Sequence, residues 1–262
     1  MSLADEIEAE ATTRQARILT IDIENSPHTL YGWGLFNQNF GINQIETPGR
    51  VICFAAKWVG ERDVLFYSDH HDGHDAMVQA AWDLLSEADI VVGYNSDRFD
   101  LTKLNWEFEQ AKMGPPRPYK TVDLLKVARR QFGHGPASKK LDYIVQSLGL
   151  GAKVAHEGMP LWIACMNGDA KAWDRMRRYN VGDVRITERL YHRWRQWIPN
   201  HPNMQLILGD EKCCTVCTGR RFKRDGEALA ALTAYPAYRC TSCGTRYRSN
   251  YVLRRVSRRT IR

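Results

Sequence analysis

Alternating apolar and polar positions mark the first predicted strand of this chain. Residues 17–24 (RILTIDIE) alternate in the manner of a strand that buries one face. Apolar runs predict further strands over 51–59, 64–67 and 89–94. Helical spacing of apolar residues predicts helices over 75–86, 99–112, 122–132, 139–148 and 170–197. Strands first, with helices interleaved after them, predict a mixed α/β domain.

Four segments depart from these periodic patterns, and the first is 1–16, which has no apolar periodicity. Residues 25–50 are rich in Gly, Asn and Pro with scattered aromatic residues, which predicts a long ordered loop or an insertion. Residues 149–168 are interrupted by glycines and no element is assigned to them. Residues 201–262 have few helical signals apart from 227–232. We therefore predict a tail over 1–16, a main domain over 17–200, and a small C-terminal module with its own tail over 201–262.

The composition excludes two broad classes of protein. Eight Trp, eleven Tyr and eight Phe among 262 residues supply enough material for a packed core, so the chain is not intrinsically disordered. No apolar run approaches the roughly 18 residues of a membrane span. The acidic start does not resemble a signal peptide. We expect a cytoplasmic protein that is neither secreted nor inserted into a membrane.

The net charge of +7 is concentrated at one end of the chain. Residues 1–200 hold 24 Lys+Arg against 26 Asp+Glu, whereas residues 201–262 hold 13 Lys+Arg against 4 Asp+Glu. The C-terminal module therefore carries +9 and the rest of the chain −2. Such asymmetry indicates a polyanionic partner, and nucleic acid is favoured over a membrane because no lipidation motif or amphipathic anchor accompanies it.

Two carboxylates lie two residues apart on the first predicted strand. Period two places the side chains of Asp22 and Glu24 on one face, where a divalent cation would offset their repulsion. A strand edge with two solvated acids is the alternative. Asp100 follows another apolar strand and begins a helix, where an ordinary acidic residue is also favoured. Tyr179 and Asp183 are four residues apart on a helix and therefore share a face.

These motifs, in this order, resemble one family of nucleases. Asp-x-Glu on a first strand, then Asn-x3-Phe-Asp, then Tyr-x3-Asp is similar to the DnaQ-like, or DEDD, 3′–5′ exonucleases of the ribonuclease H-like superfamily. The resemblance covers about residues 17–197 and is nearest to versions encoded by bacteriophages and to proofreading domains of family B polymerases. It implies a mixed sheet flanked by helices and hydrolysis of single-stranded nucleic acid from the 3′ end, with roles in DNA replication or repair.

The resemblance also implies the site residues. Asp22, Glu24, Asp100 and Asp183 match the four acids that bind two catalytic Mg²⁺ or Mn²⁺ ions, and Tyr179 marks the tyrosine subtype because position 178 is Arg rather than His. Oxygen-only ligands suit these hard cations. Asn95 and Phe99 are candidate substrate contacts, and single-stranded DNA is the favoured substrate. Two alternatives remain open: a structure-selective endonuclease of the same superfamily, and a catalytically silent nucleic-acid-binding protein.

Paired cysteines in the C-terminal module predict a structural zinc ion. Cys214-x2-Cys217 and Cys240-x2-Cys243 have the spacing of a zinc ribbon with four thiolate ligands. Cys213 competes with Cys214, although the x2 spacing favours Cys214. Two reducible cysteine pairs are the alternative, but disulfides are disfavoured in the cytosol.

Basic and aromatic residues surround these cysteines. Arg220, Arg221, Lys223 and Arg246 are candidate phosphate contacts, because guanidinium and ammonium groups bind phosphates. A solvated basic face, or a ribbon that docks a replication or recombination protein, would have the same composition. A second polar stretch, 69–75, contains three His and three Asp. It could hold a metal ion, but we favour an exposed loop.

Overall fold

The computed structural model describes residues 15–257, which fall into two compact units. One unit holds Arg17–Leu190, and the other contains the described residues from Tyr191 onward. The division lies inside one long helix, α7 (Ala170–Trp194), and so precedes the predicted boundary at residue 200. Most of the predicted N-terminal tail, 1–16, lies outside the described residues.

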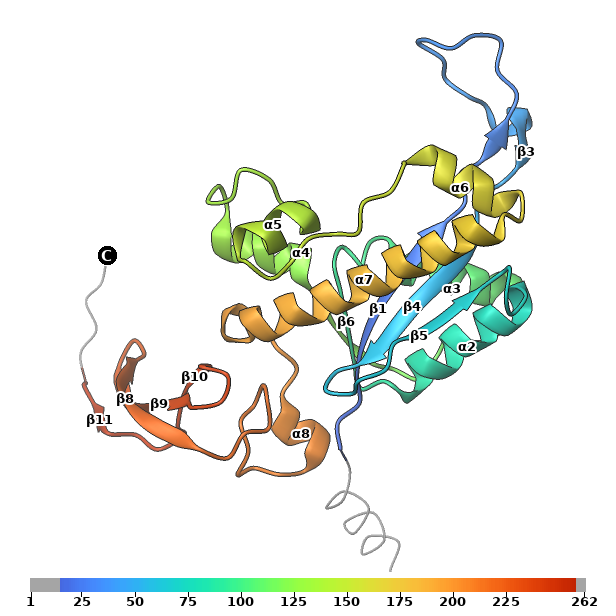
Figure 1. The fold of residues 1–262 in the computed structure, drawn as a ribbon. Helices are drawn as coiled ribbons and strands as arrows, with labels where there is room; N and C mark the ends of the chain where they lie inside the picture. Colours follow the sequence, from blue (N-terminus) through green and yellow to red (C-terminus); the bar gives the residue numbers. More distant parts are fainter. Residues whose placement is uncertain (1–14, 258–262) are drawn as a thin grey trace, which may run out of the picture. The chain divides into compact units, whose positions relative to one another are not determined.

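A five-stranded mixed sheet forms the centre of the first unit (Figure 1). In spatial order its strands are β5 (Leu65–Ser68), β4 (Val51–Trp58), β1 (Ile18–Asn25), β6 (Ile90–Gly93) and β7 (Lys120–Asp123). The strand β1 pairs antiparallel with β4 and parallel with β6, while β4–β5 is antiparallel and β6–β7 is parallel. The predicted fold class, a mixed sheet flanked by helices, is confirmed.

Helices cover both faces of this sheet. Ile21 and Ile23 of β1 and Phe54 of β4 belong to a buried cluster with residues of the helices α2 (His74–Glu87) and α3 (Asp100–Gln110). On the other face, residues of β4 pack against α6 (Met159–Met166) and α7. Burying each large apolar side chain contributes about 1.5–3 kcal/mol, so the two clusters fix the sheet between the helices. Three shorter helices follow β7, namely α4 (Leu124–Val127), η2 (Ala128–Phe132) and α5 (Leu141–Ser147).

The alternation in β1 sends its charged residues to one face. Ile21 and Ile23 are 1% and 3% exposed in the cluster below α2 and α3. Because successive strand side chains point to opposite faces, Asp22 and Glu24 point toward α7. Their partners across the antiparallel ladder are Ala55 and Cys53. The apolar half of the strand therefore anchors the carboxylate half.

One predicted helix is wrong, and another begins two residues later than predicted. The segment 122–132 begins as β7, because Val122 pairs with Val92 of β6, and its helix starts only at Leu124. Parallel pairing with a distant strand overrides the helical spacing at the first two residues, and 124–132 is helical as predicted. The segment 227–232 lies largely in the strand β8 (Phe222–Leu229), where Glu227 pairs with Pro236. The unassigned segment 149–168 contains α6.

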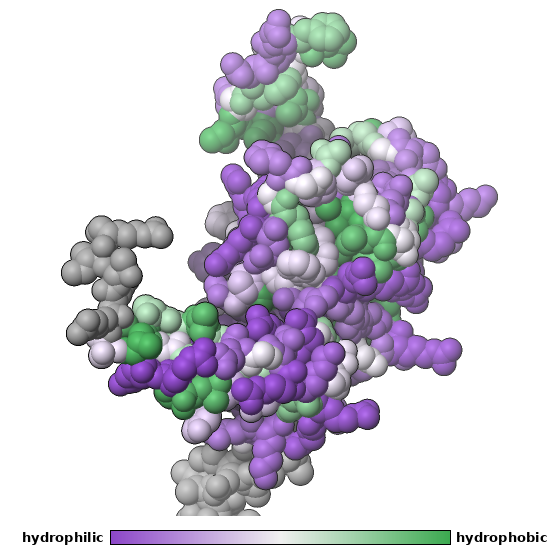
Figure 2. All heavy atoms as spheres, turned by 90° about the vertical axis from the view of Figure 1, so that its left-hand side faces the viewer, coloured by the Kyte–Doolittle hydropathy of each residue, from purple (hydrophilic) through white to green (hydrophobic). Residues whose placement is uncertain are grey.

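The insertion at 25–50 is a hairpin that extends beyond the end of the sheet (Figures 1 and 2). Its short strands, β2 (Thr29–Leu30) and β3 (Ile45–Thr47), pair antiparallel, and a single turn, η1 (Ile42–Gln44), precedes β3. We call residues 29–47 the aromatic arm. At its root the Ser26 amide donates to the Arg50 carbonyl at 2.9 Å, and the Arg50 amide donates to Ser26 Oγ at 3.0 Å.

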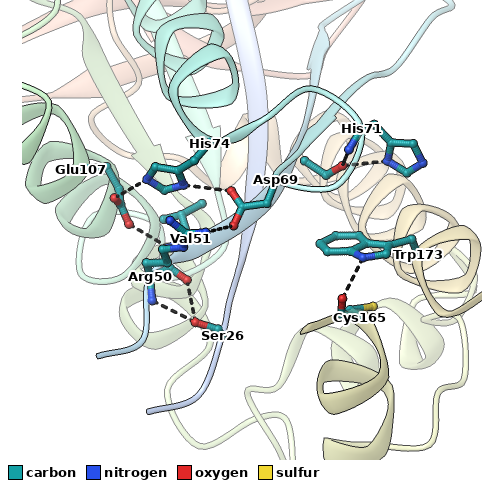
Figure 3. Close-up of polar contacts among 10 residues, drawn as sticks. Ser26, Arg50, Val51, Asp69, His71, His74, Glu107, Cys165 and Trp173 are labelled. Carbon is teal, nitrogen blue, oxygen red and sulfur yellow. Dashed lines mark hydrogen bonds and ion pairs between the residues drawn. The ribbon is translucent and has the colours of Figure 1, made fainter. Parts of the chain in front are cut away.

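A polar network holds the root of the aromatic arm to the sheet and helices (Figure 3). Arg50 contacts Asp69 at 2.8 Å, and Asp69 in turn accepts a hydrogen bond from His74 Nδ1 at 2.8 Å. The other ring nitrogen of His74 contacts Glu107 at 3.2 Å, and Glu107 accepts the Val51 amide at 2.8 Å. His74 is thus the first residue of α2 rather than part of the expected exposed loop. A cavity of about 690 Å³ adjoins the network.

The network shifts the protonation of His74 and Glu107. Hydrogen bonds to Asp69 and Glu107 raise the pKa of His74 to about 9. Burial alone would raise the pKa of Glu107, but the hydrogen bonds from His74 and Val51 outweigh it and lower that pKa. Both shifts favour the charged pair over neutral side chains.

We expect the substitution His74→Gln to destabilise the protein in a pH-dependent way. A raised histidine pKa stabilises the fold fully below its ordinary value of 6.5, and this contribution is lost as the pH rises through about 9. The loss in unfolding free energy should therefore be about 1.5–3 kcal/mol at pH 7 and much smaller at pH 10. Thermal or urea unfolding at both pH values measures it. His134→Gln, in a turn, is the control, and an equal loss at pH 7 and pH 10 would contradict the role of His74.

Candidate functional site

Three carboxylates from two elements converge on the α7 face of the sheet. Asp22 and Glu24 come from β1 and Asp183 from α7, and one oxygen of each lies within 4.8 Å of the others. Asp183 is 1% exposed. The period of the strand and the packing of α7 across the sheet bring together residues that are about 160 positions apart. The predicted grouping of Asp22, Glu24 and Asp183 is present in the geometry.

Asp100 approaches the same strand from α3. It is the first residue of that helix and 4% exposed, and its Oδ1 accepts the Ile23 amide at 3.0 Å. Ile23 lies between the two acids of β1, so this hydrogen bond fixes Asp100 beside them. The charge of Asp100 contributes to the raised pKa of Asp22.

Burial and mutual repulsion make this cluster costly in its ionised form. Burial, with the charges of Asp100, Glu24 and Asp183, raises the pKa of Asp22 well above its ordinary value. Burial, followed by the charge of Asp183, raises the pKa of Glu24 to about 8. Burial raises the pKa of Asp100 to about 6 and also raises that of Asp183. Like charges held together in a partly buried site favour a bound cation.

Lys153 supplies a cation that the sequence analysis missed. Its Nζ donates to Asp183 Oδ2 and contacts the Tyr179 hydroxyl at 3.2 Å. Burial opposes the charge of this ammonium, but the neighbouring Asp183 carboxylate outweighs burial and raises the pKa of Lys153. The residue lies in the segment interrupted by glycines, where Gly151 has a φ of +123° and Gly158 a φ of +77°. No periodic signal marks such a segment.

Asn180 is a second residue that the sequence analysis missed. It is fully buried on α7, and its Nδ2 donates to Asp22 Oδ2 at 2.7 Å and to the Asp22 carbonyl at 3.0 Å. It therefore ties the helix to the strand at the carboxylates and orients one of them. The sequence spacing could have predicted this residue, since Asn180 lies three residues before Asp183 and therefore shares a helix face with it.

The Tyr179 side chain is held in place beside Asp183. The residue is 8% exposed, and its ring meets His156 at 4.6 Å and Trp162 at 6.1 Å between centroids, both edge to face. Burial and then the charge of Asp183 raise the pKa of its phenol, so the hydroxyl stays protonated at neutral pH. It is available as a hydrogen-bond donor.

The two candidate substrate contacts near Asp100 have different surroundings. Asn95 adopts a left-handed conformation with a φ of +67°, and its amide donates to Asp123 Oδ1 at 2.9 Å. That contact holds the turn between β6 and α3. Phe99, immediately before α3, is 41% exposed. The Phe99 ring is therefore accessible to a substrate, whereas the backbone of Asn95 is held by its hydrogen bond to Asp123.

In the second unit, four cysteine sulfurs form a compact cluster. Cys214 Sγ lies 3.7 Å from Cys243 Sγ, and Cys217 Sγ lies 3.6 Å from Cys240 Sγ. All four lie within 4.8 Å of one another, and none forms a disulfide. Four sulfurs placed about 2.3 Å from a central Zn²⁺ in tetrahedral array are about 3.8 Å apart. The spacing fits such an ion.

Two tight turns present these sulfurs. In the first, the Cys214 amide donates to the Gly219 carbonyl at 2.8 Å, and the Thr218 amide donates to Cys214 at 3.2 Å. In the second, the Gly244 amide donates to the Cys240 carbonyl at 3.0 Å. Cys213 lies outside the cluster, with its sulfur 3.2 Å from the Asp210 carbonyl. The geometry places Cys214, and not Cys213, with the other three cysteines.

Two of the four predicted basic residues lie on the sheet of this unit, Lys223 on β8 and Arg246 on β10 (Arg246–Arg248), while Arg220 and Arg221 immediately precede β8. This sheet consists of β8, β9 (Thr233–Cys240), β10 and β11 (Arg254–Arg255), with β8, β10 and β11 all paired to β9. Arg220 pairs with Asp210 at 2.5 Å and Arg246 with Asp225 at 3.0 Å. Arg221 and Lys223 are exposed, and within residues 15–257 neither joins an ion pair.

Comparisons with known proteins concern mainly the first unit. A family model described as the RNase_H superfamily matches residues 43–195, more than half of the chain. A solved structure of the family B DNA polymerase from the hyperthermophilic archaeon Pyrobaculum calidifontis is similar, with a TM-score of 0.51 and 18% identity over 69% of this chain and 25% of that one. This likeness shows a shared fold.

A structure of RNase D from Trypanosoma brucei has a TM-score of 0.42 and 19% identity, over 72% of this chain and 61% of that one. This chain thus spans less than two thirds of either protein. No curated protein matches the sequence. Among the described residues, no helix is both long and apolar enough to cross a membrane. The matched family model and the five-stranded mixed sheet lead to one conclusion: the chain belongs to the RNase_H superfamily.

Proposed function

We propose that this protein is a metal-dependent 3′–5′ exonuclease of the tyrosine-containing DEDD subtype, which hydrolyses single-stranded DNA to mononucleotides. One observation carries the proposal: Asp22, Glu24 and Asp183 are gathered on one face of the sheet with Asp100 beside them. The proposal divides the chain into a nuclease domain, 17–200, and a zinc-ribbon module, 201–262. A bacteriophage source, a cytoplasmic location and a role in DNA replication or repair remain predictions from the sequence.

The carboxylates fit divalent cations on the chemistry of their donors. They offer only oxygen ligands, which suit Mg²⁺ or Mn²⁺. Asp183 Oδ1 is buried and accepts no hydrogen bond from any described residue, so it has an unused acceptor. In this proposal Asp22, Glu24, Asp100 and Asp183 hold two ions. When bound, such ions activate water and neutralise charge on the scissile phosphate and the leaving oxygen.

Three other side chains prepare the site for hydrolysis. Asn180 holds one oxygen of Asp22, so the direction of that carboxylate is set before a substrate arrives. Tyr179 keeps its proton and offers a hydrogen bond that orients the attacking water. Lys153 places a positive charge between Tyr179 and Asp183, where the negative charge of a phosphate would otherwise meet only acids.

The zinc ribbon serves as a second contact in this proposal. Cys214, Cys217, Cys240 and Cys243 would hold one structural Zn²⁺, and the exposed Arg221 and Lys223 would attract the phosphate backbone of the substrate. Docking of a replication or recombination protein on the ribbon is the competing role.

The proposed activity is tested with linear and circular single-stranded DNA in Mg²⁺ or Mn²⁺. The linear strand should be degraded from its 3′ end to mononucleotides while the circle persists. Asp22→Ala and Asp183→Ala should each lower the rate by about 10³-fold or more, because each removes a metal ligand. Tyr179→Phe, which removes one orienting hydrogen bond, should cost about 10–100-fold. Nicking of the circle would establish an endonuclease instead, and equal losses in all three variants would refute the assigned roles.

Lys153 and the metal ions should offset the same buried charge. In protein dialysed free of divalent cations, we expect Lys153→Met to lower the free energy of unfolding by about 1–3 kcal/mol, because Asp183 loses the ammonium that pairs with it. Added Mn²⁺ should then raise the Tm of the variant more than that of the unaltered protein.

Calorimetric or fluorescence melts with and without Mn²⁺ measure this difference. Lys126→Met is the matched control, since that lysine is 63% exposed and pairs with Asp97 on the surface. It should change stability by less than about 1 kcal/mol. A Lys153→Met variant with the same Mn²⁺-induced shift as the unaltered protein would contradict the prediction.

The charges of the ribbon should appear in the salt dependence of binding. The double variant Arg221→Gln/Lys223→Gln should reduce the slope of log affinity against log salt by about 1.4, because each phosphate contact to a single strand accounts for about 0.7. Titration of a labelled oligonucleotide at several salt concentrations measures the slope, and elemental analysis should still find one zinc per chain. Lys171→Gln in the nuclease domain is the control. An unchanged slope in the double variant would favour the protein-docking role.

A further inference from the structure

The aromatic arm exposes large apolar side chains that contribute to neither of the buried clusters of the nuclease domain. The exposed fractions are 99% for Trp33, 93% for Leu35, 83% for Phe36, 88% for Ile42 and 68% for Tyr31. Single exposed apolar residues are ordinary, but a contiguous group of them marks a surface that binds something. The arm is the uppermost part of the molecule in Figure 2, where hydrophobic and hydrophilic residues lie side by side.

Polar contacts within the arm give these side chains a defined scaffold. The Tyr31 amide donates to the Gln44 carbonyl at 2.9 Å, and Gln44 Nε2 donates back to the Tyr31 carbonyl at 3.0 Å. The Tyr31 hydroxyl donates to Glu46 at 2.6 Å. The ring of Phe40 lies so close to Gly32 that a Cβ there would meet it at 2.7 Å. The exposed residues are presented on a folded hairpin.

The chemistry of the arm fits nucleobases better than phosphates. Residues 29–45 contain no Asp, Glu, Lys, Arg or His, and their polar side chains are mainly the amides of Asn and Gln. Glu46 is the one charged residue of the arm and is acidic, so the arm gives no electrostatic attraction for a phosphate backbone. Aromatic rings stack on the π-face of any unpaired base, and amides hydrogen-bond to base edges.

The arm is continuous with the carboxylate strand. β1 carries Asp22 and Glu24, ends at Asn25, and leads directly into β2 at Thr29. The network of Arg50, Asp69 and His74 fixes the returning end of the hairpin to the same sheet. When the 3′ end of a nucleic-acid strand lies at these carboxylates, the arm therefore extends from the same β-strand that carries Asp22 and Glu24.

We propose that the aromatic arm binds the unpaired bases of the substrate strand upstream of its 3′ end, with Trp33 as the main stacking residue. This inference rests on the proposed exonuclease function and adds to it a contact that recognises bases without regard to their sequence. In this role the arm discriminates single strands from duplexes, because paired bases keep their faces stacked on one another.

The test compares a base-bearing strand with a strand that is abasic at the third to tenth nucleotides from its 3′ end. Both keep the same phosphates and the same two terminal bases. In buffer without added Mg²⁺ or Mn²⁺, Trp33→Ala should weaken binding to the base-bearing strand by about tenfold and leave binding to the abasic strand unchanged. Trp33→Phe should restore most of the affinity. Trp197→Ala is the matched control, since Trp197 is 47% exposed and lies in η3 (Arg195–Trp197), which belongs to the second unit and not to the arm.

Two results would overturn the inference. Equal weakening for base-bearing and abasic strands would show that the arm does not contact bases. A change from dimer to monomer in sedimentation velocity, with base-dependent binding intact, would show that the arm binds a second copy of this chain. Exonuclease activity is measured separately, as the removal of 3′-terminal nucleotides from a short strand in Mg²⁺. That reaction does not depend on Trp33, so the two proposals can fail independently.

Discussion

Repulsion among buried carboxylates is the constraint on which this fold depends. Asp22, Glu24, Asp100 and Asp183 come from three elements, and each has a pKa raised first by burial. Two apolar clusters fix β1 between its covering helices, and this packing holds the acids together against their repulsion. The Ile23 amide and the side chains of Asn180 and Lys153 supply the local compensation.

Local patterns predicted much of this site. Period two placed Asp22 and Glu24 on one face, and the i, i+4 spacing placed Tyr179 and Asp183 on another, because both relations depend only on regular backbone geometry. Lys153 escaped prediction since it lies in a segment without periodicity, and only the tertiary fold brings it to Asp183. The start of the helix predicted over 122–132 was placed two residues too early, because β7 ends at Asp123 and its pairing with β6 is parallel and distant in sequence. The hairpin of the arm lacks strands long enough to alternate visibly.

The proposed function assigns two kinds of attraction to two parts of the chain. The ribbon module carries +9 by its formal charges, or about +7 once four thiolates and one Zn²⁺ are included. It attracts phosphates over a range that decreases as the salt concentration rises. The aromatic arm carries no charge over residues 29–45 and acts only on contact. A polymer with a charged backbone and apolar bases offers a partner to each. The acidic site itself then needs little affinity for the strand.

The shortness of the strands in the aromatic arm has a consequence for solubility. An exposed apolar hairpin with free backbone edges is a template for pairing with other chains, and charged residues, which usually prevent this, are lacking between Thr29 and Ile45. Here β2 has two residues and β3 three, and glycines at 32, 34 and 41 interrupt the segment between them. Few unpaired amides and carbonyls lie in register along either edge. The arm can therefore present bare aromatic rings to solvent without offering a strand long enough to seed cross-β stacking.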